Sequence, residues 1–173
     1  MKSNVSLRRT VALLLVVLVV NRCLNPLTSP GAGVYGPDST RVTVERVVDG
    51  DTLMLDDGTR VRLIGVDAPE LGHGRGPDDP FAADARQRLQ KLIADSGVRL
   101  EFDRERRDSW FRILAYVYCD DVLVNEEIIR SGYARALTRF PFRSSMKRRF
   151  RRAEEEARDA GRGMWEHRTA GQP

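Results

Sequence analysis

The sequence predicts an α+β domain in which short antiparallel strands surround an inserted helix. About five β-branched or alternating segments lie within residues 41–124, and three segments repeat apolar side chains at helical spacing. One of these helical segments, residues 81–93, lies between the third expected strand and the fourth. This order suits a small closed barrel, although side-chain periodicity alone does not separate a barrel from an open sheet.

The expected strands are short and are separated by turn residues. Their ranges are 42–48, 53–55, 60–66, 98–102 and 113–118, followed by a short segment at 122–124. Asp56, Asp57 and Gly58 predict a hairpin turn between the second strand and the third, because glycine adopts positive φ freely. Residues 72–80 have no periodicity and are expected to form a loop.

Three helices are predicted from their apolar faces and from residues that favour helix ends. Asp79 and Pro80 favour the start of the first helix, and Asn125 is expected to cap the second, which Gly132 would end. The third helix is expected over residues 144–160, with a buried stripe of Met146, Phe150, Ala153 and Ala157. We interpret its basic run, residues 147–152, as a solvated face; the alternative is a contact with nucleic acid.

The first 40 residues predict a segment separate from this domain. Lys2, Arg8 and Arg9 precede the unbroken apolar run 11–20, which as a helix would span about 15 Å, half of the hydrocarbon core. This pattern is typical of a signal peptide or signal anchor over residues 1–24, followed by a linker over 25–40 that is rich in proline and glycine. The protein is therefore expected to be secreted, periplasmic or otherwise extracytoplasmic, and anchored in a membrane if the segment stays uncleaved.

Composition limits the remaining chain to one domain, expected over residues 41–168, with a tail at 169–173. Of the 173 residues, 41% are hydrophobic and 31% are charged, which excludes a disordered, collagen-like or multi-span membrane protein. Two cysteines exclude a disulfide framework or a zinc cluster. Residues 41–138 carry 15 basic and 19 acidic side chains, whereas residues 139–173 carry 10 basic and 5 acidic ones, so any basic surface is local.

Two acidic motifs follow strand ends and predict a cation site. The first is Asp49-Gly50-Asp51-Thr52, and the second is Asp67-Ala68-Pro69-Glu70. If the second and third strands form a hairpin, the motifs lie side by side, and their mutual repulsion requires a compensating cation. Oxygen ligands favour Ca²⁺, Mg²⁺ or Mn²⁺. The alternative is that Asp49 and Gly50 only provide turn chemistry.

Two arginines near these motifs suggest phosphate chemistry. Arg62 lies on the strand that leads to Asp67, and Arg112 directly precedes an apolar strand. The planar fork of a guanidinium group matches phosphate oxygens, so an arginine beside a carboxylate-bound metal is typical of a phosphoryl-transfer site. Taken singly, each arginine also fits a surface residue or an ion-pair partner.

Five motifs, in order over residues 41–166, resemble the staphylococcal nuclease (thermonuclease) family. They are Val48-Asp49-Gly50-Asp51-Thr52, the segments 62–70 and 108–117, the segment 124–134 from Val124-Asn125-Glu126-Glu127 to Gly132-Tyr133-Ala134, and Gly163-Met164-Trp165. The resemblance implies a five-stranded OB-fold barrel with three helices. It also implies a Ca²⁺-dependent nuclease that acts on DNA and RNA, for which Mg²⁺ or Mn²⁺ are alternative metals.

The same resemblance implies roles for individual residues. Asp51, Asp67 and the Ala68 carbonyl would be ligands of Ca²⁺. Glu70 would position or deprotonate the attacking water. Arg62 and Arg112 would bind the phosphate and stabilise charge as the 5′ P–O bond breaks, which leaves 3′-phosphate products.

The chain departs from the family pattern where a nucleotide would bind. Ser109, Trp110 and Phe111 stand in place of a Lys-Tyr-Gly stretch, and Thr138 and Phe140 stand in place of two tyrosines. Trp110 and Phe140 are expected either to stack on bases or to pack in the core or at the rim of the site. Because His73 and His167 lack metal-ligand spacing, we expect both to be exposed and to bind no metal.

Two other classes of function stay open at this point. One is a noncatalytic OB-fold module that binds nucleic acid or protein, for which the five side chains Asp51, Asp67, Glu70, Arg62 and Arg112 would not be needed together. The other is a membrane-bound interaction protein, which would rest on the N-terminal segment alone. We expect a monomer whose contact with a membrane is limited to that segment.

Overall fold

A computed structural model of the chain describes residues 39–74, 76–93 and 97–168. The predicted signal or anchor segment, all but the last two residues of the linker, and the tail at 169–173 lie outside the described residues. In the described part of the chain, no helix combines the length and the apolar character that a membrane crossing requires.

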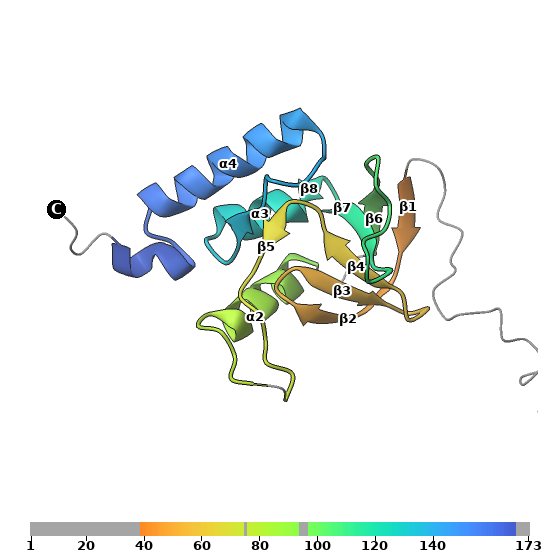
Figure 1. Ribbon diagram of the computed structural model, residues 1–173, viewed down its shortest axis with the longest axis horizontal. Helices are drawn as coiled ribbons and strands as arrows, with labels where there is room; N and C mark the ends of the chain where they lie inside the picture. The colour runs from red at the N-terminus through yellow and green to blue at the C-terminus, as the bar shows by residue number, and fades with distance from the viewer. Residues whose placement is uncertain (1–38, 75, 94–96, 169–173) are drawn as a thin grey trace, which may run out of the picture. The chain divides into compact units, whose positions relative to one another are not determined.

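The main sheet has seven strands and follows the order β1-β6-β7-β4-β3-β2, with β8 paired to β7 (Figure 1). Its strands are β1 (Ser39–Val42), β2 (Val44–Asp49), β3 (Thr52–Leu55), β4 (Arg60–Leu63), β6 (Val98–Glu101), β7 (Ile113–Cys119) and β8 (Val122–Leu123). All pairs are antiparallel except β4 and β7, which are parallel with Arg62 opposite Leu114. Since β4 and β7 are neighbours, the segments that precede β7 and those that lie along β4 are close in space.

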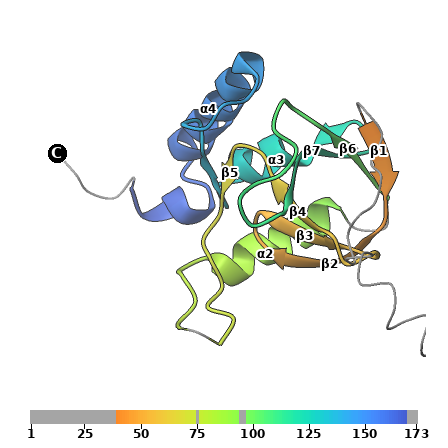
Figure 2. The same cartoon turned by 45° about the vertical axis from the view of Figure 1, so that its right-hand side comes forward.

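The expected third strand, residues 60–66, is two strands in the structure. Gly65 separates β4 from β5 (Val66–Asp67) and has a φ of +74°. A Cβ atom at this position would lie 2.7 Å from the Phe150 ring. The bend therefore requires glycine, both because its φ is positive and because a side chain would clash with Phe150. β5 leaves the main sheet, pairs with β9 (Arg135–Ala136) and lies near α3 in both views (Figures 1 and 2).

The structure confirms the α+β class and the three predicted α-helices. They are α2 (Ala82–Leu92), α3 (Val124–Arg130) and α4 (Ser144–Asp159), and a 3₁₀-helix, η1 (Gly163–Arg168), follows. A closed five-stranded barrel is not found among the described residues, where β1 and β2 end the hydrogen-bonded order of the sheet. Two register shifts interrupt the pairing of β2 with β3, an irregularity that side-chain alternation does not reveal.

The core lies between the sheet and the three helices. Its largest fully buried side chains include Tyr116, Phe150, Leu53, Leu63 and Leu89. The predicted stripe of α4, Met146, Phe150, Ala153 and Ala157, is buried. Within the chain's fold, α3 contacts both α2 and α4 (Figure 1).

The prediction that Asn125 caps the second helix is wrong. Leu123 occupies the cap position, and Asn125 lies inside α3, fully buried. Its side chain accepts a hydrogen bond from the Val117 N–H at 2.8 Å and donates to the Ile64 carbonyl at 2.9 Å. The amide therefore joins α3 to β7 and to the end of β4. The buried N–H and carbonyl groups of these strands have no water to bond, so the Asn125 side chain serves them instead of the start of the helix.

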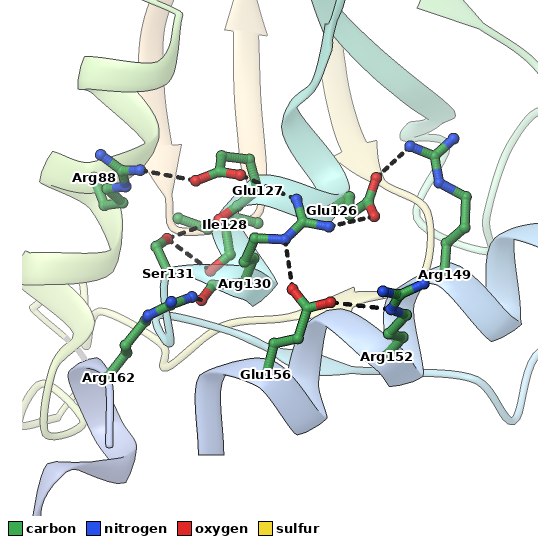
Figure 3. Close-up of polar contacts among 10 residues, drawn as sticks. All are labelled: Arg88, Glu126, Glu127, Ile128, Arg130, Ser131, Arg149, Arg152, Glu156 and Arg162. Carbon is green, nitrogen blue, oxygen red and sulfur yellow. Dashed lines mark hydrogen bonds and ion pairs between the residues drawn. The ribbon is translucent and has the colours of Figure 1, made fainter. Parts of the chain in front are cut away.

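A network of charged side chains joins α2, α3 and α4 (Figure 3). Arg130 donates to Glu126 at 2.6 Å, to Glu127 at 3.2 Å and to Glu156 at 3.0 Å. Arg88 of α2 pairs with Glu127. Each of the three nitrogens that Arg130 offers therefore has a carboxylate partner.

The basic run of α4 takes part in the same network. Arg149 pairs with Glu126, and Arg152 pairs with Glu156. Arg151 donates to the Thr138 hydroxyl. These contacts support the interpretation of this run as a solvated face of the helix rather than as a nucleic-acid contact.

Candidate active site

The turn between β2 and β3 brings the first acidic motif against the second. Asp51 is 1% exposed, and its carboxylate accepts hydrogen bonds from the Ala68 N–H at 3.1 Å and the Thr52 hydroxyl at 2.9 Å. A Cβ atom at Gly50 would lie 2.6 Å from the Cβ of Ala85 and 2.7 Å from that of Ala68. The glycine therefore lets this turn approach both α2 and the second motif.

Arg62 neutralises the buried carboxylate of Asp51. Its Nη1 lies 2.8 Å from Asp51 Oδ2 and also donates to the Val66 carbonyl at 2.8 Å. Burial raises the pKa of Asp51, and the charge of Arg62 opposes part of that rise. The guanidinium group is thus fixed between the β2–β3 turn and β5.

Arg112 is fixed by a tight turn that precedes β7. Its Nε donates to Asp108 Oδ2 at 2.7 Å, and its backbone N–H donates to Asp108 Oδ1 at 2.9 Å. The parallel pairing of β4 with β7 places this turn beside Arg62. Both arginines line one groove with a volume of about 550 Å³.

Glu70 lies within electrostatic range of these groups. Partial burial, followed by repulsion from Asp51 and Asp49, raises its pKa, whereas Arg62 and Arg112 act in the opposite direction. Its backbone N–H donates to Asp79 Oδ2 at 3.0 Å, and its carbonyl accepts from the Asp79 N–H at 2.9 Å. This reciprocal pair closes the neck of the loop that protrudes between β5 and α2 (Figure 2).

Asp67 lies where two grooves meet. It is exposed on β5 and lines the groove of Arg62 and Arg112. It also lines a second groove, of about 460 Å³, together with Ala68, Glu70 and Arg135. The predicted site residues therefore surround one region, although Asp67 and Glu70 are exposed and Asp51 is buried.

The described residues contain no group of three histidine, cysteine, aspartate or glutamate side chains arranged to hold a metal ion. The smaller ligand set that the family resemblance implies has two carboxylates, those of Asp51 and Asp67, and the Ala68 carbonyl. These oxygen donors fit a hard cation such as Ca²⁺. The fit rests on the chemistry of the donors and on the contact of Asp51 with Ala68.

Three residues of the site were not identified from the sequence. His73 is 49% exposed, and its Nε2 lies 2.8 Å from Asp49 Oδ1, so it is not simply a solvated side chain. Asp79 holds the backbone of Glu70, and Asp108 holds Arg112. Of these three residues, only Asp108 could have been identified from the sequence, because it lies four positions before the arginine that it binds.

Three of the five residues that depart from the family pattern line the groove. Ser109, Trp110 and Phe140 line it, and both aromatic side chains are exposed. The alternative that they belong to the core is therefore wrong. Thr138 accepts a hydrogen bond from Arg151, and Phe111 projects into solvent.

Comparisons with known proteins identify the family of this chain. The family described as "Staphylococcal nuclease homologue" matches residues 60–167. The chain is 38% identical over 144 residues to the thermonuclease of Staphylococcus intermedius, covering 79% of this chain and 85% of that protein. It is 32% identical over 137 residues to the thermonuclease of Staphylococcus hyicus, covering 78% and 80%. It is 34% identical over 128 residues to Endonuclease YncB of Bacillus subtilis, covering 72% and 61%. The extent of the family match and these identities show that the chain belongs to the staphylococcal nuclease family.

Proposed function

We propose that the protein is a Ca²⁺-dependent nuclease that hydrolyses phosphodiester bonds of DNA and RNA. The observation that carries this proposal is the placement of Arg62 and Arg112 on one groove that Asp67 also lines, with Glu70 in electrostatic range of both arginines. Relatives named thermonuclease and endonuclease support the same class of reaction.

Asp51, Asp67 and the Ala68 carbonyl would hold the metal ion. When bound, the ion would neutralise phosphate charge and act as a Lewis acid. The guanidinium charge of Arg62 opposes part of the rise in the pKa of Asp51 that burial causes, and so favours the ionised carboxylate that a metal ion needs.

Glu70 would accept a proton from the attacking water. Its raised pKa suits this role, because a general base works best when its pKa approaches the working pH. The bonds with Asp79 fix the backbone from which the carboxylate extends.

Arg62 and Arg112 would donate hydrogen bonds to the phosphate oxygens. Their positions are set by Asp51, Val66 and Asp108 before substrate arrives, so little reorganisation is needed as charge develops. Attack of water on phosphorus with departure of the 5′ oxygen would leave a 3′-phosphate and a free 5′-hydroxyl.

The test uses the full-length chain with single-stranded DNA and with RNA. Each substrate is incubated with Ca²⁺, with Mg²⁺, with Mn²⁺ and with a chelator, and the ends of the products are identified. We expect Ca²⁺-dependent cleavage that yields 3′-phosphates. Tight binding without cleavage under any metal would instead support a noncatalytic nucleic-acid-binding module.

We further propose that the protein works outside the cytoplasm, on the strength of the apolar run 11–20 and its basic flank. N-terminal sequencing of the exported protein would distinguish cleavage of this segment from anchoring. Retention of the whole chain in the cytoplasm would contradict the proposal.

A further inference from the structure

The second groove, of about 460 Å³, adjoins the groove of Arg62 and Arg112 at one residue. Asp67 is the lining residue that the two grooves share. A phosphodiester joins two nucleosides, so a phosphate at Arg62 and Arg112 places one nucleoside on each of its sides. The volume of the second groove lies within the roughly 300–1,000 Å³ of small-molecule sites. The second groove therefore has the position and the size to receive one of these two nucleosides.

Apolar side chains from two elements form part of the second groove. Pro80 and Phe81 directly precede α2, and Met164 belongs to η1. Phe81 and Met164 are half-buried, so each is held by the fold and keeps a surface that a ligand can contact. The flat face of a base packs well on an aromatic ring and on the polarizable sulfur of methionine. These side chains therefore suit a base.

Phe81 is an unusual residue for the place that it occupies. It is the N-cap of α2 with a φ of +69°, and its side chain makes no hydrogen bond to the helix. Asparagine would tolerate this conformation better and would also cap the helix. Strained residues of this kind cluster at ligand sites. Contact of the phenyl ring with a ligand offers a role for a residue that neither the backbone nor the helix start favours.

The acidic side chains of the second groove favour a neutral ligand. Three carboxylates line it, those of Asp67, Glu70 and Asp79, and they repel an anion inside the groove. The base and the sugar of a nucleotide are neutral, and their N–H and hydroxyl groups donate hydrogen bonds that carboxylates accept. The groove therefore fits the nucleoside part of a substrate rather than its phosphates.

Arg135 is the only cation among the described residues that line the second groove. It is exposed on β9, opposite Asp67 of β5. Its guanidinium lies 5.8 Å from the centre of the Trp165 ring and forms no ion pair with a described residue. Its charge is therefore available to a phosphate that follows a nucleoside bound in the groove.

We propose that the second groove binds the nucleoside on one side of the scissile phosphate, with its base packed on Phe81 and Met164 and the next phosphate of the strand held by Arg135. The inference rests on the proposed nuclease function for the position of the scissile phosphate. It extends that function by giving each of the two nucleosides its own groove, with Asp67 between them.

The first test separates the two nucleosides of the substrate. The full-length chain is incubated with Ca²⁺ and one of three diesters: a dinucleoside monophosphate, and two methyl diesters that keep only the nucleoside on the 5′ oxygen or only that on the 3′ oxygen. We expect Phe81→Gly to raise KM at least about 5-fold for the dinucleoside monophosphate and for one of the two methyl diesters. The KM of the other methyl diester should change less than about 2-fold, because that substrate leaves the second groove empty.

Met164→Ala reaches the same groove from another element. It should raise the same two KM values as Phe81→Gly and spare the same methyl diester. A variant that merely loses structure would instead change the rates on all three substrates. The methyl diester that responds also assigns the direction in which the strand crosses the site.

The second test concerns the flanking phosphate. The dinucleoside monophosphate is extended by one phosphate beyond the nucleoside in the second groove. Arg135→Ala should raise the KM of the extended substrate about 3–5-fold, as for an exposed ion pair, and should leave that of the parent unchanged. Arg158→Ala is the matched control, because Arg158 lies 4.4 Å from the centre of the same Trp165 ring but lines neither groove.

Two results would overturn the inference: equal changes for all three diesters, or wild-type KM values in both Phe81→Gly and Met164→Ala. Failure of the proposed function looks different, since the wild type would then cleave none of the diesters with Ca²⁺, Mg²⁺ or Mn²⁺. In that case the affinity for a fluorescent trinucleotide still tests the groove. Weaker binding by Phe81→Gly and Arg135→Ala would support a nucleotide site in a noncatalytic protein, whereas unchanged affinity would overturn the inference as well.

Discussion

Arginine–carboxylate pairs occur in two regions of the molecule and differ in how many donors they use. At the interface of α3 and α4, Arg130 directs all three of its nitrogens to carboxylates (Figure 3). At the groove, Arg62 uses Nη1 and Arg112 uses Nε for their contacts with described carboxylates. Full pairing indicates a structural cross-link, whereas partial pairing at a groove leaves donors for a ligand.

The largest expected effect is on catalysis. Arg62→Ala or Arg112→Ala should lower kcat about 10²–10³-fold, or roughly 3–4 kcal/mol, because each removes donors placed where charge develops. Initial rates on single-stranded DNA with Ca²⁺, together with circular dichroism, provide the measurement. Arg60→Ala, at an exposed arginine on the same strand as Arg62, is the matched control. Wild-type turnover by either folded variant would remove these arginines from the site.

The second prediction concerns stability at the α3–α4 interface. Arg130→Ala should lower the free energy of unfolding by roughly 1–3 kcal/mol, since it removes the common partner of three carboxylates, of which those of Glu126 and Glu127 are partly buried. Denaturant unfolding measures this change, and the folded variant should keep its kcat. Arg152→Ala, which removes one ion pair of an exposed arginine, should have a much smaller effect. Equal losses in the two variants would show that the number of carboxylate partners does not matter.

The smallest effect is expected at Asp103, which contacts the residue that precedes α4. It lines the groove, but its hydrogen bonds come from Tyr116 Oη at 2.6 Å and from the N–H of Arg143, the N-cap residue of α4, at 2.9 Å. Burial would raise the pKa of Asp103, but these bonds together with one from Arg104 outweigh burial and lower it. The ionised carboxylate of Asp103 therefore stabilises the fold at pH values above its unfolded-state pKa of about 3.9. This stabilisation is lost as the pH falls through the lower pKa that Asp103 has in the folded state.

Asp103→Asn should therefore lower stability at neutral pH by about 1 kcal/mol and should flatten the loss of stability below about pH 4. Urea unfolding at a series of pH values provides the measurement. An unchanged acid profile in the variant would show that another carboxylate controls stability in this range.

Local patterns predicted the elements well and their long-range pairing poorly. The three helices were confirmed, because an apolar stripe such as that of α4 reports burial directly. The two acidic motifs lie together as expected, because a hairpin brings its two ends to one edge. The prediction that Asn125 caps a helix failed, since an asparagine that can cap a helix can equally bond buried backbone groups in the core.

The remaining differences come from contacts between distant segments. β9 has two residues and is defined only by its pairing with β5, so no periodicity could indicate it. His73 meets Asp49 across 24 positions of the chain, and the sequence between them gives no sign of that contact. The closed barrel was expected from the order of short strands with an inserted helix and from the family resemblance, whereas the hydrogen bonds of each strand edge decide closure.

The parallel pairing of β4 with β7 has a consequence for how activity depends on folding. The pairing covers three residue positions, and through it the guanidinium groups of Arg62 and Arg112 come to one groove from distant parts of the chain. Local opening of this short ladder would separate the two groups even if every helix stayed intact. Because Val61, Leu63 and Ala115 of this ladder are buried in the core, the ladder should open only when the core does, so activity and helical signal should be lost together on heating.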